Sequence, residues 1–417
     1  MRRLGIMSFI LVGFVAGIAF TYSCGGGGGS SSSAATTIDQ LEARVEVLEA
    51  KLSYATISTA VINGVTGPHL IISGVNIHIQ NGAAQTDTNN GLGNLIVGYN
   101  EVPTVLGAGD RSGSHNLIVG PAHKYSTYGG LAGGWRNTLS GVHASIPGGA
   151  LNTASGDFST VSGGGGNTAS GYGSVVSAGN TNSAIGTSSA VSGGYTNFST
   201  GDRASITGGY NNTASGSMSS INGGRDNNAT GPYATVSAGF MGTASGNGSA
   251  ISGGSSNTAS HDYAVVSGGY LNISRGYGSV VSGGSNNRAT TTYATVSGGY
   301  ANTASGHTSV VSGGSNNTAT YTYSTVSGGY NNIASGTNSV VSGGSTNKAT
   351  STYTTVGGGW SNTASGNTSS VSGGYGNYAT NNYAVVSGGY ANTASGIGSV
   401  VSGSSVQTAS GTYQHLP

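Results

Sequence analysis

The sequence predicts an all-β protein: a parallel β-solenoid, or β-roll, with 15-residue coils, preceded by a short coiled-coil helix. First, Val, Ile or Leu occupies every fifteenth position from Leu131 to Val401, nineteen times in succession. Second, pairs of Gly recur at the same interval, and Gly makes up 79 of the 417 residues. Third, only 6% of the residues are charged. A regular aliphatic position in so glycine-rich a chain indicates stacked coils and not a disordered tract.

Composition divides the chain into five segments. Residues 1–23 are predicted to be a signal peptide and residues 24–36 a Gly/Ser tether. Residues 37–54 are predicted to form a coiled coil, residues 55–130 an irregular β cap region, and residues 131–417 the β-solenoid repeat array. The first coil of a parallel stack has an open edge, which templates association unless it is covered. We therefore expect the β cap region to cover the first coil of the array.

The N-terminal segment has the layout of an export signal. Arg2 and Arg3 precede an apolar run that ends at Phe20 and is short for a membrane span. The only cysteine, Cys24, follows and is succeeded by GGGGGSSSS. This placement resembles a bacterial lipoprotein signal, which implies lipid attachment at Cys24 and display at the bacterial outer membrane or cell surface. Secretion without a lipid is the alternative.

Alternating spacings of three and four residues predict the coiled coil. The apolar residues at these spacings are Ile38, Leu41, Val45, Leu48 and Leu52. A helix this short is marginal in water on its own, so we expect it to form together with identical partners. The pattern does not distinguish a dimer from a trimer. A lone amphipathic helix packed on the repeats is the alternative.

The β cap region contains parts of the repeat pattern. The sequence NLIVG occurs at residues 94–98 and again at residues 116–120, which indicates coils with longer turns. Alternating apolar residues over residues 75–79 predict a further strand with one buried face. This region also carries several chemically versatile side chains: Glu101, Asp110, Arg111, His115 and His123. A catalytic cluster among them is the alternative to a purely structural cap.

Each repeat is predicted to contain two short strands separated by Gly-bearing turns. The aliphatic residue of the first strand faces a small residue of the second, nearly always Ala, so the coil is thin. The second Gly of the VSGG motif is predicted to need a positive φ, whereas the first only has to be small. Asn begins the second strand in seventeen of nineteen repeats, which predicts a ladder of Asn side chains along the axis. The two ladders include Val281, Val296 and Val311 in the interior and Asn287, Asn302 and Asn317 at the amide positions.

Aromatic residues follow a second period, which is twice as long as the first. Tyr293, Tyr323 and Tyr353 belong to one row, and a parallel row passes through Tyr300 and Tyr330. With 15-residue coils, the rings fall on every second coil and small residues of the coil between lie beneath them. A structural ladder that fills the turns is favoured over a track on which a ligand stacks. The same period also permits a coil of double length with four strands.

The alternation of S-x-V-S-G-G with N-x-A-S-G resembles the repeats in the head domains of trimeric autotransporter adhesins of the YadA type. The resemblance covers about residues 131–411 and, in a general way, the adjoining coiled coil. It implies a left-handed parallel β-roll that trimerises. The repeat here is one residue longer than that of the family, and we expect no C-terminal membrane barrel. Attachment at Cys24 would hold the opposite end of the chain.

The array lacks the residue patterns of common enzymes, so we expect no catalysis, cofactor or metal. Glycoside hydrolysis requires paired carboxylates, yet no Asp or Glu follows Asp262. The histidines His261, His307 and His415 are interpreted as isolated. Phosphate-binding and dinucleotide motifs are absent. With 12 basic and 11 acidic residues, the chain offers no basic stripe for nucleic acid.

These observations predict a cell-surface repeat protein, a non-catalytic adhesin or structural fibre that forms a lipid-anchored homotrimer. The trimer is expected because a thin Val/Ala interior buries little apolar area per coil. The sequence does not specify the partner, whether matrix protein, glycan or another cell-surface ligand. An ice-binding solenoid is one alternative, because Thr318 and Thr320 exemplify outward hydroxyl rows, although Ile273, Arg275, Arg288, Ile333, Lys348 and Tyr378 interrupt them. A purely architectural rod similar to a phage fibre is another.

Overall fold

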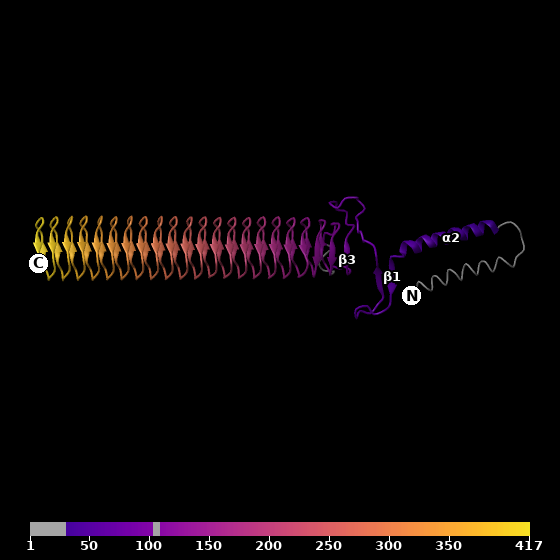
Figure 1. Cartoon of the computed structure of the whole chain (residues 1–417), viewed down its shortest axis with the longest axis horizontal. Coiled ribbons are helices and arrows are strands. Elements are labelled where there is room, and N and C mark those ends of the chain that lie inside the picture. Colours follow the sequence, from indigo (N-terminus) through magenta and orange to yellow (C-terminus); the bar gives the residue numbers. More distant parts are fainter. Residues whose placement is uncertain (1–30, 103–108) are drawn as a thin grey trace. The chain divides into compact units, whose positions relative to one another are not determined.

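The chain forms two compact units, Met1–His78 and Ile79–Pro417. The computed structural model describes residues 31–102 and 109–417. The predicted signal peptide and Cys24 lie outside the described residues. In the second unit, short strands stack in chain order along one axis (Figure 1). The fold is a parallel β-solenoid that is preceded, within the described residues, by one helix, which confirms the predicted fold class.

Helix α2 (Ser31–Leu52) begins earlier than the predicted coiled coil and includes the end of the predicted tether. The run of Gly stops at Gly29, and the Ser, Ala and Thr residues that follow do not break a helix. Leu41, Leu48 and Leu52 of the predicted seam are 44%, 55% and 61% exposed. The seam is thus largely uncovered in the single chain.

A two-stranded antiparallel sheet follows the helix. In it, β1 (Ala55–Ser58) pairs with β2 (His69–Ile72), so that Ala55 lies opposite Ile72. The prediction of a strand over residues 75–79 is wrong, because this segment has no strand conformation. Its apolar residues Val75, Ile77 and Ile79 are 43%, 65% and 41% exposed. Alternation forms no strand where no neighbouring strand supplies hydrogen bonds to the backbone.

One sheet of the solenoid, the Val sheet, carries the aliphatic ladder. It consists of β3 (Leu95–Val97), β4 (Leu117–Val119), β6 (Leu131–Gly133) and the even-numbered strands from β8 (Ser145–Ile146) to β44 (His415–Leu416). From β8 onward these strands have two residues each and recur at every fifteenth position. Val281 pairs in parallel with Val296, and Val296 with Val311. This register confirms the 15-residue coil and excludes the coil of double length.

The opposite sheet, the Thr-Ala sheet, contains the second predicted strand of each coil. It consists of β5 (Lys124–Tyr125) and the odd-numbered two-residue strands from β7 (Thr138–Leu139) to β43 (Thr408–Ala409), which have the same spacing as the Val sheet. A third line of pairing, which was not predicted, runs through single residues in the turn that leads from the Val sheet to the Thr-Ala sheet. It extends from the Trp135–Ala150 bridge to the Tyr390–Ser405 bridge. One residue per coil is too short for alternation to reveal a strand.

The first coils depart from the predicted ladder. Leu131 pairs with Ser145 on the outer face, and it is Ala132 that is fully buried and pairs with Ile146. The aliphatic ladder therefore begins its regular spacing at Ile146, one coil later than predicted. In the Ala132 coil the large buried residue of the Thr-Ala sheet is Leu139, where later coils have Ala. A large residue opposite a small one conserves the core volume, whichever sheet supplies it.

Part of the predicted cap is itself solenoid. Leu95 of β3 pairs in parallel with Leu117 of β4, and Leu117 pairs with Leu131. The repeated NLIVG segments thus lie on neighbouring coils with a long connection, as their similarity predicts. Ile96 of β3 is 44% exposed, whereas Ile118 beside it is fully buried. Within its own unit, the first strand leaves one edge of the Val sheet open.

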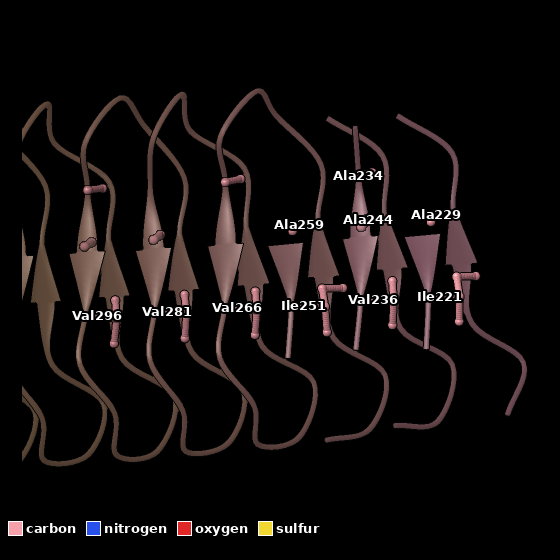
Figure 2. Packing of buried hydrophobic residues seen from close by; sticks show 14 of the residues in the cluster. Ile221, Ala229, Ala234, Val236, Ala244, Ile251, Ala259, Val266, Val281 and Val296 are labelled. Atoms are coloured by element: carbon pink, nitrogen blue, oxygen red, sulfur yellow. The ribbon is translucent and has the colours of Figure 1, made fainter. Parts of the chain in front are cut away.

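The core is one continuous row of apolar side chains along the solenoid axis, with large side chains from one sheet facing small ones from the other. Val266, Val281 and Val296 of the Val sheet and Ala259 of the Thr-Ala sheet have no exposed area, and all belong to one buried cluster (Figure 2). Each Val contributes roughly 1.5–3 kcal/mol by leaving water. Because each coil buries so few apolar atoms, the fully buried Asn residues must also be hydrogen-bonded without exception.

The Asn ladder joins side chains to the backbone. Asn302 Oδ1 accepts the backbone N–H of Asn317 at 2.9 Å, and its Nδ2 donates to the carbonyls of Gly298 at 2.8 Å and Gly314 at 2.9 Å. Asn287 and Asn317 make the same three kinds of bond in their coils. The predicted ladder is therefore present. Most amides join their own turn to the neighbouring coil, and direct amide-to-amide bonds also occur, from Asn197 to Asn182 and from Asn212 to Asn197. At Gly242 the rung is missing, because the Gly242 N–H donates to Asn227 Oδ1 but Gly has no Oδ1 to accept the N–H of the next coil.

The two glycines of VSGG differ as predicted in φ but not in size. Gly284 has φ +81°, and a Cβ there would collide with the carbonyl oxygen of Gly299 in the next coil. A Cβ on Gly283 would meet open space, so the first position tolerates more than a small residue. Only the second glycine is required by both φ and close backbone approach.

His123 takes the place of Asn on one rung near the start of the solenoid. Its Nδ1 accepts the backbone N–H of Asn137 at 3.2 Å, and its own backbone N–H donates to Asn100 Oδ1 at 2.8 Å. Since Nδ1 accepts, the proton of the neutral ring sits on Nε2, which donates to the Val119 carbonyl at 3.1 Å. Burial disfavours the charged ring and lowers the pKa of His123 below its ordinary value of 6.5, although the carbonyl bond opposes this.

Asn302→Ala is expected to lower the free energy of unfolding by about 2–4 kcal/mol, because three hydrogen bonds are lost and buried backbone groups lose their partners. Gly242→Asn is expected to raise it by about 1 kcal/mol by adding the missing rung. Urea denaturation of the full chain measures both changes. The exposed Ser312→Ala serves as control and should stay within about 0.5 kcal/mol of the parent. Equal effects of Asn302→Ala and Ser312→Ala would contradict the structural role of the ladder.

Acidification is expected to loosen the coils around His123. The unfolded chain takes up a proton near pH 6.5 while the folded ring resists it, so this contribution to stability is complete above pH 6.5 and declines as the pH falls below it. Hydrogen exchange of residues 117–137 between pH 7.5 and 5.5, corrected for intrinsic rates, measures the change. His123→Asn keeps a rung without a titrating group and should abolish the pH dependence; if it persists, another group is responsible.

Candidate ligand-binding edge

The turn that leads from the Thr-Ala sheet back to the Val sheet forms a tyrosine edge. Seven tyrosines occupy the same place in this turn on every second coil, with φ of 54–62° and exposed fractions of 51–76%. They are Tyr233, Tyr263, Tyr293, Tyr323, Tyr353, Tyr383 and Tyr413. A left-handed backbone costs a residue with a Cβ roughly 1–2 kcal/mol. The backbone conformation of the turn therefore does not explain why tyrosine occupies this position.

Inter-coil contacts hold each of these rings in place. The backbone N–H of Tyr293 donates to the Tyr277 carbonyl of the preceding coil at 2.8 Å. The ring lies against Gly278, where a Cβ would come within 2.9 Å of Tyr293 Cε1. Gly248 lies beneath Tyr263 in the same way. Gly398 lies beneath Tyr413 likewise, so the expectation of a small residue under the ring holds for three of the seven tyrosines. Before Tyr323 and Tyr353 the same turn position holds Thr308 and Asn338.

The second aromatic row lies at the other turn, on the line of single-residue bridges. Tyr300 and Tyr330 each bridge to serines of the neighbouring coils and are both 55% exposed. Where two successive coils carry an aromatic residue here, the rings are in contact: Tyr375 and Tyr390 stack with centroids 5.2 Å apart, whereas Trp360 and Tyr375 meet edge to face at 4.7 Å. The two rows thus give the array exposed aromatic rings at both turns.

A second alternation underlies the tyrosine edge. Two residues before the tyrosine position, Gly occupies every coil from Gly141 to Gly246, and from His261 onward bulkier residues alternate with Gly. The alternation runs His261, Gly276, Thr291, Gly306, Tyr321, Gly336, Ser351, Gly366 and Asn381. A Cβ on Gly276 would collide with the backbone of Thr291, and one on Gly306 with that of Tyr321. Bulky residues are thus accommodated because each has Gly neighbours.

This alternation creates a hollow of about 400 Å³ at the tyrosine edge, here called the His261–His307 hollow. Its lining comes from the same turn of four successive coils. The lining residues are His261, Arg275, Gly276, Tyr277, Thr290, Thr291, Thr292 and His307. The interpretation of His261 and His307 as isolated is therefore wrong. Two residues far apart in the sequence line one hollow because coil stacking shortens the distance between them.

Most of the versatile side chains of the β cap region make hydrogen bonds within the fold. His115 Nε2 accepts the Asn81 N–H at 3.2 Å, and Arg111 donates to the carbonyls of Asn100 and His123. Asp110 accepts the Ser112 N–H, and the hydrogen bonds from Ser112 lower the pKa of this carboxyl. Glu101 is exposed. In residues 31–102 and 109–417, no three His, Cys, Asp or Glu side chains are grouped as metal ligands.

The outer faces of the two sheets differ in regularity. On the Thr-Ala sheet, Ile273 pairs with Arg288, Ile333 with Lys348 and Thr363 with Tyr378, so the predicted interruptions lie within the hydroxyl row. On the Val sheet, the outward residue of every strand from β8 to β42 (Val400–Val401) is Ser, Thr, Ala or Val. The cleaner face is thus the one opposite to that considered from the sequence.

No helix within the part of the chain that the structure describes is long and apolar enough to cross a membrane. No protein-family model matches the chain, and no curated protein is significantly similar to it.

Proposed function

We propose that this chain is a cell-surface, non-catalytic adhesin or structural fibre. The observation that carries the proposal is the pair of exposed aromatic rows on a regular stack of hydrogen-bonded coils. Aromatic side chains are effective contact residues at low conformational cost. Repetition along one chain converts weak contacts into high avidity. A purely architectural rod requires the coils, but it does not require tyrosines in a left-handed backbone conformation.

The likeness to YadA-type heads supports the same proposal. It consists of the parallel coils, the Gly-closed turns and the N-terminal helix that begins with Ser31. We extend it to export and to lipid attachment at Cys24, which would leave the array projecting from a bacterial surface. The coil is one residue longer than in that family, which sets a limit to the likeness.

Three surfaces support assembly as a homotrimer. The seam of α2 is largely uncovered, and the outer face of the Val sheet is uncharged over β8 to β42. A two-stranded sheet such as β1 and β2 is marginal alone, and its Ile57 and Leu70 are 52% and 67% exposed. Three copies side by side would bury these surfaces together.

Ice binding is the second candidate. The uninterrupted outer face of the Val sheet, where Thr295, Val310 and Thr325 follow one another in register, favours it over the face considered from the sequence. Inhibition of ice recrystallisation by the purified chain tests it directly. If this activity is present, the Val-sheet face carries it and lateral assembly through that face is excluded.

The chain without residues 1–23 is expected to sediment as a trimer. Leu41→Ser combined with Leu48→Ser should weaken the trimer, because both side chains belong to the seam. Val47→Ser is the matched control: Val47 is 53% exposed and lies outside the seam, so the mass should not change. A monomer in the parent chain would contradict the proposed assembly.

Removal of three tyrosine rings is expected to reduce attachment to host cells or matrix by about tenfold or more, because avidity depends on the number of sites. The variant is Tyr293→Gly, Tyr323→Gly and Tyr353→Gly, which relieves left-handed backbone and so preserves the fold. The matched control, Thr308→Gly, Asn338→Gly and Thr368→Gly, changes the same turn position in the coils between, where φ is 55–56°.

The measurement is attachment of intact cells that display the chain, with antibody labelling to verify display. Cys24→Ala should release the array from the cells if the lipid holds it. Equal attachment by the tyrosine variant and its control would contradict the adhesin proposal, and the structural fibre would remain as the proposed function. An array that stays inside the envelope would contradict both.

A further inference from the structure

The His261–His307 hollow brings together side-chain types that are rare in the rest of the array. His261 and His307 are the only histidines between Ile146 and Gly411, and both line it together with Arg275. Its turns are in register, since Gly278 N–H donates to the Asp262 carbonyl at 2.9 Å and Thr308 N–H to the Thr292 carbonyl at 3.0 Å. The stack therefore fixes the relative positions of the backbone segments that carry these side chains.

The hollow carries positive charge without a counter-charge. No carboxylate is among its lining residues, and no Asp or Glu follows Asp262, whereas Arg275, Arg288 and Lys348 do. Asp262, the residue after His261, accepts the Asn247 N–H at 3.1 Å with its carboxylate and forms no ion pair with Arg275. Arg225 and Asp226 form the one ion pair among the described residues. The guanidinium of Arg275 therefore has no acidic partner among these residues. An anion would find a charged fork in the hollow.

The remaining polar groups are mostly hydrogen-bond donors available to a ligand. His261 Nδ1 accepts the Asp262 N–H at 2.8 Å, so the neutral ring carries its proton on Nε2. His307 Nδ1 lies 2.9 Å from Thr308 Oγ1, which leaves its Nε2 without a partner in the described chain. The hydroxyls of Thr290 and Thr292 are also without one among the described residues, whereas Thr291 donates to the Gly306 carbonyl at 2.7 Å. Two imidazoles and two hydroxyls therefore accompany the guanidinium.

Tyr277 adds an apolar face. Its ring packs edge to face against Tyr263 at 5.5 Å and Tyr293 at 5.7 Å, so its orientation is set by both neighbours. The ring is still 38% exposed. A fixed, partly exposed aromatic ring beside hydroxyl groups suits the apolar face of a pyranose. The size of the hollow lies in the usual range for small-ligand sites.

We propose that the His261–His307 hollow binds the anionic group of an acidic sugar, a carboxylate or a sulfate on a pyranose ring. Arg275 pairs with the oxyanion, His261 and His307 donate from Nε2, and Tyr277 contacts the ring. The inference rests on the proposed function of the array as a binding surface and names the ligand class of one site on it. It also gives one place along the array a specificity that the repeated tyrosines lack.

Titration calorimetry of the full chain with three hexasaccharides tests the proposal. The probes are a hyaluronan oligosaccharide, which carries carboxylates, a chondroitin sulfate oligosaccharide, which carries carboxylates and sulfates, and maltohexaose as the neutral reference. At least one acidic probe should bind about tenfold more tightly than maltohexaose. Arg275→Gln should weaken that binding by about tenfold. Arg288→Gln removes the same charge from the next coil but lies outside the hollow, and should change it by less than about twofold.

Several outcomes would overturn the inference. Equal losses in Arg275→Gln and Arg288→Gln would indicate unspecific attraction of anions. Equal affinity for maltohexaose would leave only the aromatic contact, and equal affinity for polyglutamate would remove the sugar from the proposal. To separate binding from any effect of the arginine on folding, His307→Gln is the second variant, and it should weaken binding while Arg275 is kept.

The same variants in the attachment assay separate this inference from the proposed function. Attachment that depends on the tyrosines, without binding of either acidic oligosaccharide, means that the inference alone fails. Binding of an acidic oligosaccharide that depends on Arg275, without attachment to any surface, means that the adhesin proposal alone fails.

Discussion

Each 15-residue repeat has to complete one turn around the solenoid axis, so that its backbone N–H and C=O groups meet those of the next coil. Strands of two residues provide little pairing on their own, and the turns must therefore be in register as well. Asn302 shows how this is achieved: one amide joins its own turn, the next turn and the next strand. The second Gly of each VSGG motif lets two turns approach closely enough for those bonds. Inner positions are consequently uniform in kind, while outer positions are free to vary.

That division explains which parts of the fold the sequence can predict. Val281, Val296 and Val311 are identical because each meets the same surroundings, so the period directly predicts the coil and its register. The prediction fails at Leu131, since the regular spacing ends there and the exchange of Ala132 with Leu139 shifts the large residue to the other sheet. Periodicity carries no information on β1 and β2, which occur once in the chain.

The tyrosine edge and the hollow differ in the same respect. Tyr293, Tyr323 and Tyr353 could be predicted as a row because their spacing is regular, and they lie in one row of turns. Their left-handed backbone could not, because tyrosine rarely adopts it. His261 and His307 could not be brought together from the sequence, since one precedes its tyrosine position by two residues and the other by one. Only the stacked turns show that these offsets converge on Gly276.

The alternation of bulky residues with Gly beside the tyrosine edge also restricts how the gene for such an array can change in length. Loss or duplication of a single coil between His261 and Asn381 would place two bulky residues, or two exposed tyrosines, on adjacent coils. Loss or duplication of two coils together would preserve both alternations. Recombination between repeats is therefore expected to leave functional descendants that differ in length by whole pairs of coils. An ancestral duplication unit of two coils accounts for the regularity of the C-terminal half.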